Sequence, residues 1–267
     1  MDKIKEIANE LAAGFVKNYK CSLPDAIDFF HDKLVKNEEV CKIINSAASD
    51  KQLSKNATFK EFVKKNKKEL YYKLRRYKTG ELEIDGSKEE MLEKLSQVHV
   101  SSQERFAQNE LFYEQLSKFV AGVVVDVGCG VQPLYFPKEK FPSVEKYVAL
   151  DKDRESISIM QKFKDVFDYS WLYPKVWNIS EGWNEKFDVA LILKVIPVVK
   201  RIDPTLLDEL ARVPANTIIV SGVKESMVKK HNIEYKERRA IDSFIKLCDR
   251  EVIAEFELDN EFFIVLQ

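Results

Sequence analysis

The first hundred residues carry the apolar spacing of helices. Apolar residues recur every three or four positions, at Ile4, Ile7, Leu11 and Phe15, which is the period of one buried helix face. A second series of the same kind follows Pro24, and a short helical pattern over residues 88–95 closes the region. We therefore predict an all-helical N-terminal domain, residues 1–97.

The pattern changes after about residue 120 to short apolar runs that alternate with helical stretches. The runs that suit strands buried on both faces are residues 123–125, 147–150, 189–193 and 217–220. A further strand is expected at residues 175–177. Two further runs, 251–257 and 262–266, are joined by only four residues, so we expect them to be antiparallel. The pattern predicts an α/β domain over residues 98–267, with a mostly parallel, Rossmann-like sheet that ends in an antiparallel hairpin. This architecture resembles that of the class I S-adenosylmethionine-dependent methyltransferases.

A glycine turn follows the first strand. Residues 124–130 read Val-Val-Asp-Val-Gly-Cys-Gly, and glycines at 128 and 130 let the backbone approach a ligand where a Cβ would collide. The second strand ends about twenty residues later in Asp151, where a carboxylate would accept hydrogen bonds from both hydroxyls of a ribose. An ordinary tight turn with a capped helix, or a nicotinamide site, would also use two glycines. Pro133 stands where the third glycine of the nicotinamide fingerprint would be, and Asp126 with the terminal hairpin favours S-adenosylmethionine.

Charge is distributed unevenly along a chain that is nearly neutral as a whole. The 267 residues hold 43 Lys and Arg against 44 Asp and Glu, yet residues 51–78 contain eleven Lys and Arg against two Glu, with aromatic residues between them. Such a segment suits phosphate contacts with folded RNA; a solvated helix face with aromatics in the core is the alternative. The residues that we expect to bind RNA are Lys64, Lys65, Lys67, Lys68, Arg75, Arg76, Lys229 and Lys230.

Several protein classes are disfavoured. No apolar stretch approaches the roughly 18 residues of a membrane span, and the acidic Asp2, Glu6 and Glu10 do not fit a signal peptide. We therefore expect a cytoplasmic protein. The four cysteines are far apart and form no C-x-x-C pair, so neither a metal site nor a disulfide framework is predicted.

Four segments together resemble one enzyme family, the aminoglycoside-resistance methyltransferases of 16S ribosomal RNA (Arm/Rmt, FmrO-like). Residues 128–134, Gly-Cys-Gly-Val-Gln-Pro-Leu, are similar to the family's G-C-G-x-N-P-L loop, and residues 99–105, His-Val-Ser-Ser-Gln-Glu-Arg, to its H-x-S-[ST]-x-E-R segment. Residues 191–200 resemble its L-L-K-x-[IL]-P-x-[LV] strand end, and residues 218–265 its last strands. The similarity spans about residues 98–267. One departure is residues 223–235, which keep the charge of the family's glycine-rich loop but not its glycines.

The resemblance implies a reaction and a site. The family transfers a methyl group from S-adenosylmethionine to N7 of a guanine in the decoding region of the small ribosomal subunit, which confers aminoglycoside resistance. By the same resemblance Arg105, beside Ser102, would bind the methionine carboxylate. Asp126 would hold the amino end of the cofactor, and Asn178 with Ile179 would meet the adenine. Lys194 ends a central strand, where ligands bind in open α/β sheets, and is our candidate for the pocket on the methyl-acceptor side.

Two other functions stay open at this point. One is a methyltransferase that acts on a different RNA, a protein or a small molecule. The other is a non-catalytic RNA-binding or ribosome-assembly protein that has kept the fold. We expect a monomer whose partner is the small ribosomal subunit with its 16S rRNA, and no membrane partner.

Overall fold

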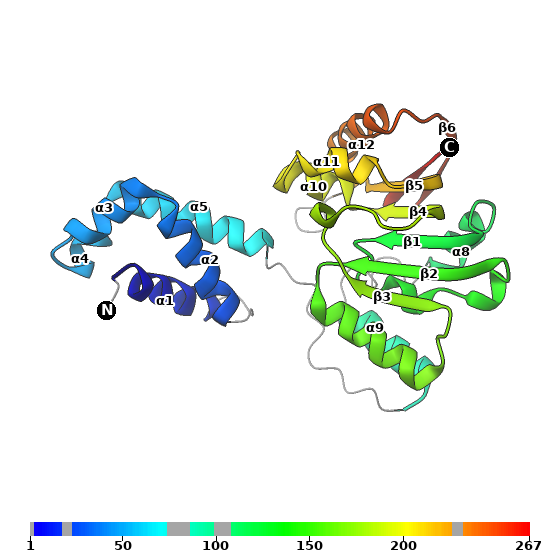
Figure 1. Cartoon of the computed structure of the whole chain (residues 1–267), viewed down its shortest axis with the longest axis horizontal. Helices are drawn as coiled ribbons and strands as arrows, with labels where there is room; N and C mark the ends of the chain where they lie inside the picture. The colour runs from blue at the N-terminus through cyan, green and yellow to red at the C-terminus, as the bar shows by residue number, and fades with distance from the viewer. Residues whose placement is uncertain (1–2, 18–22, 74–85, 99–107, 226–231) are drawn as a thin grey trace. The chain divides into compact units, whose positions relative to one another are not determined.

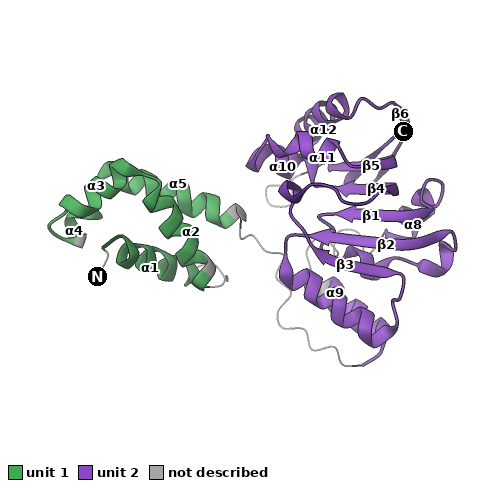
Figure 2. Ribbon diagram, viewed as in Figure 1, with its two compact units in different colours: residues 1–77 green, residues 78–267 purple. Residues whose placement is uncertain are grey.

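The computed structural model describes residues 3–17, 23–73, 86–98, 108–225 and 232–267. The chain divides into two compact units, residues 1–77 and 78–267 (Figure 2). The sequence predicts a boundary at 97/98. The helix α6 (Lys88–Val98) explains the difference, because its Met91 and Leu95 are fully buried in the core of the second unit. Apolar spacing predicts the helix but does not say which core it joins.

Unit 1 is all helical, as predicted. Its helices are α1 (Lys3–Val16), α2 (Leu23–Val35), α3 (Glu38–Ser46), α4 (Asp50–Leu53) and α5 (Ala57–Lys73) (Figure 1). Side chains at the predicted apolar positions, among them Ile7, Phe15 and Phe30, form one buried cluster. Asn37 and Asn56 accept hydrogen bonds from the backbone N–H groups of Val40 and Phe59, both at 3.0 Å, and so cap α3 and α5 at their first turns.

Unit 2 is built on a seven-stranded sheet. The strands are β1 (Gly122–Val127), β2 (Val144–Asp151), β3 (Leu172–Val176), β4 (Phe187–Leu193), β5 (Ala215–Val223), β6 (Val252–Leu258) and β7 (Glu261–Leu266). Their order is β3-β2-β1-β4-β5-β7-β6. The first five are parallel, and β7 runs antiparallel to both β5 and β6. The predicted fold, a mostly parallel sheet with a terminal antiparallel hairpin, is confirmed.

Helices cover both faces of this sheet. Buried side chains of α6, α8 (Asn109–Leu116) and α9 (Arg154–Phe167) pack in one cluster with one set of alternate strand residues. Buried side chains of α10 (Ile196–Ile202), α11 (Leu206–Ala211) and α12 (Glu234–Cys248) pack with the other set. The strand order reverses between β1 and β4, and ligands of open α/β sheets bind outside the carboxyl ends of the strands at such a reversal. This edge is therefore where a site is expected.

Candidate active site at the carboxyl edge of the sheet

The glycine turn lies at the carboxyl end of β1 in a conformation that needs glycine. Gly128 and Gly130 have φ values of +66° and +55°, in the left-handed region that side chains disfavour. The Gly128 N–H donates to the carbonyl of Leu150 at 2.7 Å. A Cβ on Gly128 would lie 2.7 Å from Cγ2 of Val195, so the segment after β4 packs directly on the turn. The backbone conformation thus favours glycine at both predicted positions.

Asp151, at the end of β2, holds this turn in place. One carboxylate oxygen accepts the Gly130 N–H and the other accepts the Asp153 N–H, each at 2.8 Å. Burial raises the pKa of the Asp151 carboxyl, and the two N–H donors partly oppose that shift. A carboxylate oxygen can accept two hydrogen bonds, so both oxygens retain capacity for a pair of ribose hydroxyls. The residue fits the predicted role, which stays a prediction.

Asp126 lies in β1, two residues before Gly128, in the interior of the unit. It is 2% exposed, and it accepts a hydrogen bond from the hydroxyl of Tyr147 at 2.9 Å. Burial, and next the charge of Asp126, raises the pKa of the Tyr147 phenol. Burial likewise raises the pKa of the Cys129 thiol, which therefore stays protonated. Asp126 thus joins β1 to β2 through Tyr147, and its predicted contact with a cofactor amino group stays a prediction.

The end of β3 lies beside the glycine turn and Asp151. We call this part of the edge, where a methyl donor would bind, the donor side. The Trp177 N–H donates to the carbonyl of Asp151 at 2.9 Å, which brings Asn178 next to the end of β2. Asn178 caps the short 3-10 helix η3 (Ile179–Glu181) in a reciprocal capping box with Glu181. Ile179 packs against the cluster formed with α10 to α12. The structure thus brings Gly128, Gly130, Asp151 and Asn178 to one edge, and a role for Asn178 and Ile179 against adenine stays a prediction.

Lys194 lies at the same edge, directly after β4. Its φ is +62°, and its backbone N–H donates to both the carbonyl and the hydroxyl of Ser221, at 3.2 and 3.1 Å. Its ammonium lies 3.3 Å from a carboxylate oxygen of Glu261. Sequence reasoning singled out Lys194 but missed Ser221 and Glu261. The one signal for Glu261 is that it opens a strand whose remaining residues, Phe-Phe-Ile-Val-Leu, are all apolar.

The edge can hold a nucleoside-containing cofactor. The glycine turn has no room for a Cβ at Gly128, and beside it stand a carboxylate with remaining acceptor capacity and a second strand end. This set lacks the third glycine that packs a helix against a pyrophosphate, because the turn continues into the 3-10 helix η1 (Gln132–Tyr135) with Pro133 at its start. The glycine turn, the Asp151 carboxylate and the end of β3 therefore suit a cofactor that has an adenosyl group and no pyrophosphate.

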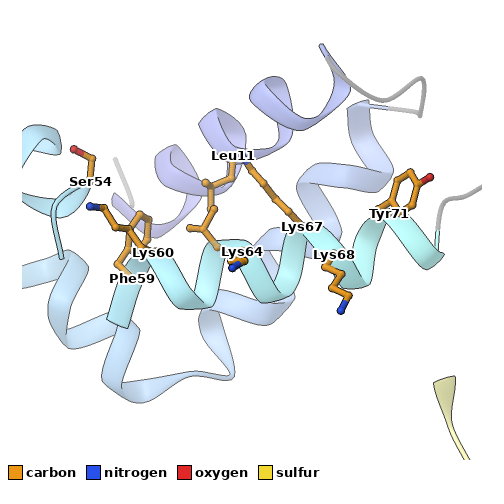
Figure 3. Close-up of a pocket in the computed structure, with 9 residues that line it drawn as sticks. Leu11, Ser54, Phe59, Lys60, Lys64, Lys67, Lys68 and Tyr71 are labelled. Atoms are coloured by element: carbon orange, nitrogen blue, oxygen red, sulfur yellow. The ribbon is translucent and has the colours of Figure 1, made fainter. Parts of the chain in front are cut away.

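The basic surface of unit 1 lies on α5. Phe59, Phe62 and Leu70 are buried, while Lys64, Lys65 and Lys68 are exposed, so the aromatics point inward and the lysines outward. A cavity of 590 Å³ opens beside them (Figure 3). The residues that line it are Leu11, Ser54, Phe59, Lys60, Val63, Lys64, Lys67, Lys68 and Tyr71. The structure therefore shows a solvated helix face with Phe59 and Phe62 in the core, and the contact of these lysines with RNA stays a prediction.

Other predicted site residues lie outside the described segments. They are Ser102, Arg105, Arg75, Arg76, Lys229 and Lys230. Within the segments that are described, no three His, Cys, Asp or Glu side chains gather in a group that could hold a metal ion. None of the helices described there has both the length and the apolar character needed to cross a membrane.

Comparison with known proteins finds methyltransferases of 16S rRNA among the proteins that this chain is similar to. A 16S rRNA (guanine(1405)-N(7))-methyltransferase from Frankia casuarinae is 29% identical over 107 residues, which are 39% of this chain and 38% of that protein. The chain thus matches about two fifths of the length of that curated relative. The structure of the 16S rRNA methylase RmtB matches 97% of this chain and 98% of its own, with a TM-score of 0.62 and 15% identity.

A second solved structure has the same fold. The 16S rRNA methyltransferase RmtF, in complex with S-adenosyl-L-homocysteine, matches over all of this chain and 92% of its own, with a TM-score of 0.57 and 15% identity. The model of the ribosomal RNA methyltransferase (FmrO) family matches residues 86–238. This match takes in every strand of the sheet up to β5, the glycine turn and most of the described carboxyl edge, and it covers more than half of the chain. The resemblance predicted from the sequence is confirmed, and the chain belongs to the FmrO family of ribosomal RNA methyltransferases.

Proposed function

We propose that this protein is an S-adenosylmethionine-dependent methyltransferase that methylates N7 of a guanine in the decoding region of 16S rRNA. The observation that carries the proposal is the edge at which the glycine turn, Asp151 and Lys194 meet, in a chain of the FmrO family. The relative from Frankia casuarinae bears the name of a guanine-N7 enzyme acting on 16S rRNA. We further propose that the protein acts as a monomer, on small ribosomal subunits in the cytoplasm.

The reaction requires alignment more than proton transfer. When bound, S-adenosylmethionine supplies a methyl group already activated by its sulfonium. N7 of guanine carries a lone pair in the plane of the base and no proton. As the bond from N7 to the methyl carbon forms, the electrons of the carbon–sulfur bond return to sulfur, and the positive charge moves to the base. Holding the reacting atoms in line can lower such a barrier by about 7–11 kcal/mol.

This chain's residues are suited to such alignment. The Gly130 N–H donates to the Asp151 carboxylate, and this bond fixes the side of the edge where we place the nucleoside of the cofactor. Lys194 follows β4, which is next to β1 and separated from β2 by β1 alone, and we place the guanine there. The reaction requires no general base, because N7 has no proton to remove. It also requires no protein nucleophile, so the buried Cys129, whose thiol has a raised pKa, has no part in it.

Unit 1 is the part that we propose docks on the RNA. Lys60, Lys64, Lys67 and Lys68 lie along one helix around an open cavity (Figure 3). Lysines placed in this way can each approach a phosphate and release its counterions. Guanine methylated at N7 would carry a fixed positive charge and lose an acceptor, and both changes disfavour a cationic aminoglycoside. Resistance to these drugs is therefore the proposed consequence for the host.

The test is methyl transfer from labelled S-adenosylmethionine to purified small ribosomal subunits, with the modified base located by strand cleavage specific for N7-methylguanine. We expect label at one guanine of the decoding region. Asp151→Ala should abolish or strongly reduce the label, and Asp165→Ala, on the exposed side of α9, serves as its matched control. Label on another RNA, or cofactor binding without transfer to subunits, would refute the proposed substrate. Failure to bind S-adenosylmethionine at all would refute an enzymatic role.

A further inference from the structure

The cavity of 590 Å³ in unit 1 runs along one side of α5 (Figure 3). Leu11 of α1 and Ser54, the residue after α4, contribute to its lining, and the other lining residues lie on α5 between Phe59 and Tyr71. This part of the helix is about 18 Å long, so the cavity is elongated. Its volume is within the range of about 300–1,000 Å³ that is usual for ligand sites. All of its lining residues belong to unit 1, so it is a different site from the carboxyl edge of the sheet in unit 2.

The walls of this cavity are largely apolar. The side chains of Leu11, Val63 and Tyr71 are half-buried and pack against the core of the unit, and Phe59 is buried in that core. The cavity therefore opens onto an extension of the core. A ligand with an apolar face would remove this surface from water, which favours binding. The aromatic ring of Tyr71 adds a surface of the kind on which nucleobases stack.

The same cavity is lined by four cations. They are Lys60, Lys64, Lys67 and Lys68. Their spacing of four, three and one residues places them on one side of α5. The lining includes no acidic side chain, and Glu69 of the same helix pairs instead with Lys33 of α2 at 2.7 Å. Among the residues that the structure describes, no carboxylate lies within 4.0 Å of any of the four ammonium groups. A polyanion can therefore reach all of them.

An apolar wall beside a row of cations fits an unpaired strand of nucleic acid. The phosphates of such a strand carry the charge that the lysines attract, and its unstacked bases present flat faces to the wall. A duplex keeps its bases stacked inside, so it would use the lysines and leave the apolar wall in water. An acidic protein segment also carries negative charge, but the substrate that we propose for this chain is an RNA.

We infer that this cavity is a binding site for an unpaired segment of the ribosomal RNA. The phosphates of the segment lie on the four lysines, and at least one of its bases leaves the stack and packs against Tyr71. The inference rests on the proposed function, which identifies the substrate as ribosomal RNA. It adds the kind of RNA structure that unit 1 binds, a single strand with an accessible base, and it gives the apolar wall a ligand that phosphate contacts alone do not.

The test compares strands that share their phosphates and differ in their bases. The probes are a single-stranded RNA of eight uridines and a chain of the same length with abasic riboses, each with a fluorescent end label. Binding to the full chain is measured by fluorescence anisotropy at several salt concentrations. The variants are Tyr71→Leu, which removes the ring, and Tyr71→Phe, which keeps it. The matched control is Phe29→Leu, at a half-buried ring on α2 that packs against the same core. The thermal unfolding midpoint of each variant is recorded, so that a folding defect is recognised.

We expect the wild-type protein to bind the uridine strand about fivefold to a hundredfold more tightly than the abasic chain, which is the effect of one stacked base. Tyr71→Leu should remove most of this difference and leave the salt dependence of binding unchanged, because the lysines remain. Tyr71→Phe and Phe29→Leu should keep the difference. Equal affinity of the wild-type protein for the two probes, or an equal loss in Phe29→Leu, would overturn the proposal.

Two further measurements separate the alternatives. A peptide of six glutamates around one phenylalanine that binds more tightly than the uridine strand would assign the cavity to an acidic protein segment and overturn the proposal. Methyl transfer to small ribosomal subunits is measured with the same wild-type protein. Transfer without a preference for the uridine strand would refute this site alone. A preference for the uridine strand without transfer would refute the proposed function and support the site.

Discussion

Replacing Gly128 with alanine tests whether the turn after β1 is held as tightly as the structure indicates. The φ of +66° costs an L-residue about 1–2 kcal/mol relative to a right-handed conformation. The new Cβ would also lie 2.7 Å from Cγ2 of Val195, well inside the roughly 3.5–4.0 Å at which carbon atoms attract one another. Valine cannot swing away as a long side chain would, because its χ1 is restricted.

The two costs can be added and separated. Relief of an overlap of this kind costs about 1–3 kcal/mol in packed interiors, so Gly128→Ala should lower the free energy of unfolding of unit 2 by about 2–5 kcal/mol. Gly128→Ala combined with Val195→Ala removes the overlap but leaves the backbone cost. The double variant should therefore regain part of the cofactor affinity that the single variant loses, although Val195→Ala alone gains nothing.

The assay is titration calorimetry with S-adenosylmethionine, together with urea unfolding followed by tryptophan fluorescence. If 1.4 kcal/mol or more of the strain is relieved by moving the turn away from its binding position, affinity falls at least about tenfold. Gly14→Ala is the matched control: Gly14 lies in α1 with nothing within 4 Å of a Cβ, so the same change there should stabilise the helix by about 0.5–1 kcal/mol. A Gly128→Ala protein with unchanged affinity and stability would refute the account of the turn.

Three further predictions concern charge and reactivity. Burial raises the pKa of Asp151 above its ordinary value of 3.8. The stability that this shift contributes is therefore complete below pH 3.8 and is lost as the pH rises through the folded-state pKa. Asp151→Asn should flatten this part of the curve of stability against pH, measured by urea unfolding at a series of pH values. Lys64→Glu with Lys67→Glu should weaken binding to small subunits and reduce the slope of log affinity against log salt by about 0.7–0.9 for each phosphate that the variant no longer neutralises, with cofactor affinity unchanged; Lys36→Glu is the control on the same unit, and an unaltered slope would exclude these lysines from the interface. Cys129, buried with a raised pKa, should resist iodoacetamide at pH 8 in the folded protein and react in urea, as mass spectrometry of its peptide would show; rapid labelling without urea would mean that the turn opens.

The donor side of the site could be predicted because its signals are local. A strand, two glycines and an acid about twenty residues later stand in one stretch of sequence, and the structure joins Gly130 and Asp151 by a hydrogen bond. Lys194 was found by its place at a strand end. Its partners could not be predicted. Ser221 lies 27 residues after Lys194, and Glu261 lies 40 residues after Ser221, so the three residues meet only through the order of the strands.

The predicted boundary at 97/98 differs from the division at 77/78 in the structure for a related reason. The apolar positions of α6 predicted a helix, and the helix is present, but its Met91 and Leu95 bury against residues of the sheet domain. Helical spacing identifies a buried face without naming what covers it. For the same reason, the sequence alone could place the lysines of α5 on a solvated face but could not show that four of them surround a cavity with Leu11 of α1.

The backbone between β4 and α10 links the two halves of the site. Val195 occupies the space that a Cβ on Gly128 would need, and Lys194, the residue before it, is held to Ser221 and Glu261. A shift of this short segment would therefore change the donor turn and the acceptor side together. The reaction that we propose depends on keeping sulfur, methyl carbon and N7 in line, so the position of these two residues would set the position of the two ligands relative to one another. The dipeptide makes these contacts with Lys194 in a left-handed conformation, at a φ of +62°.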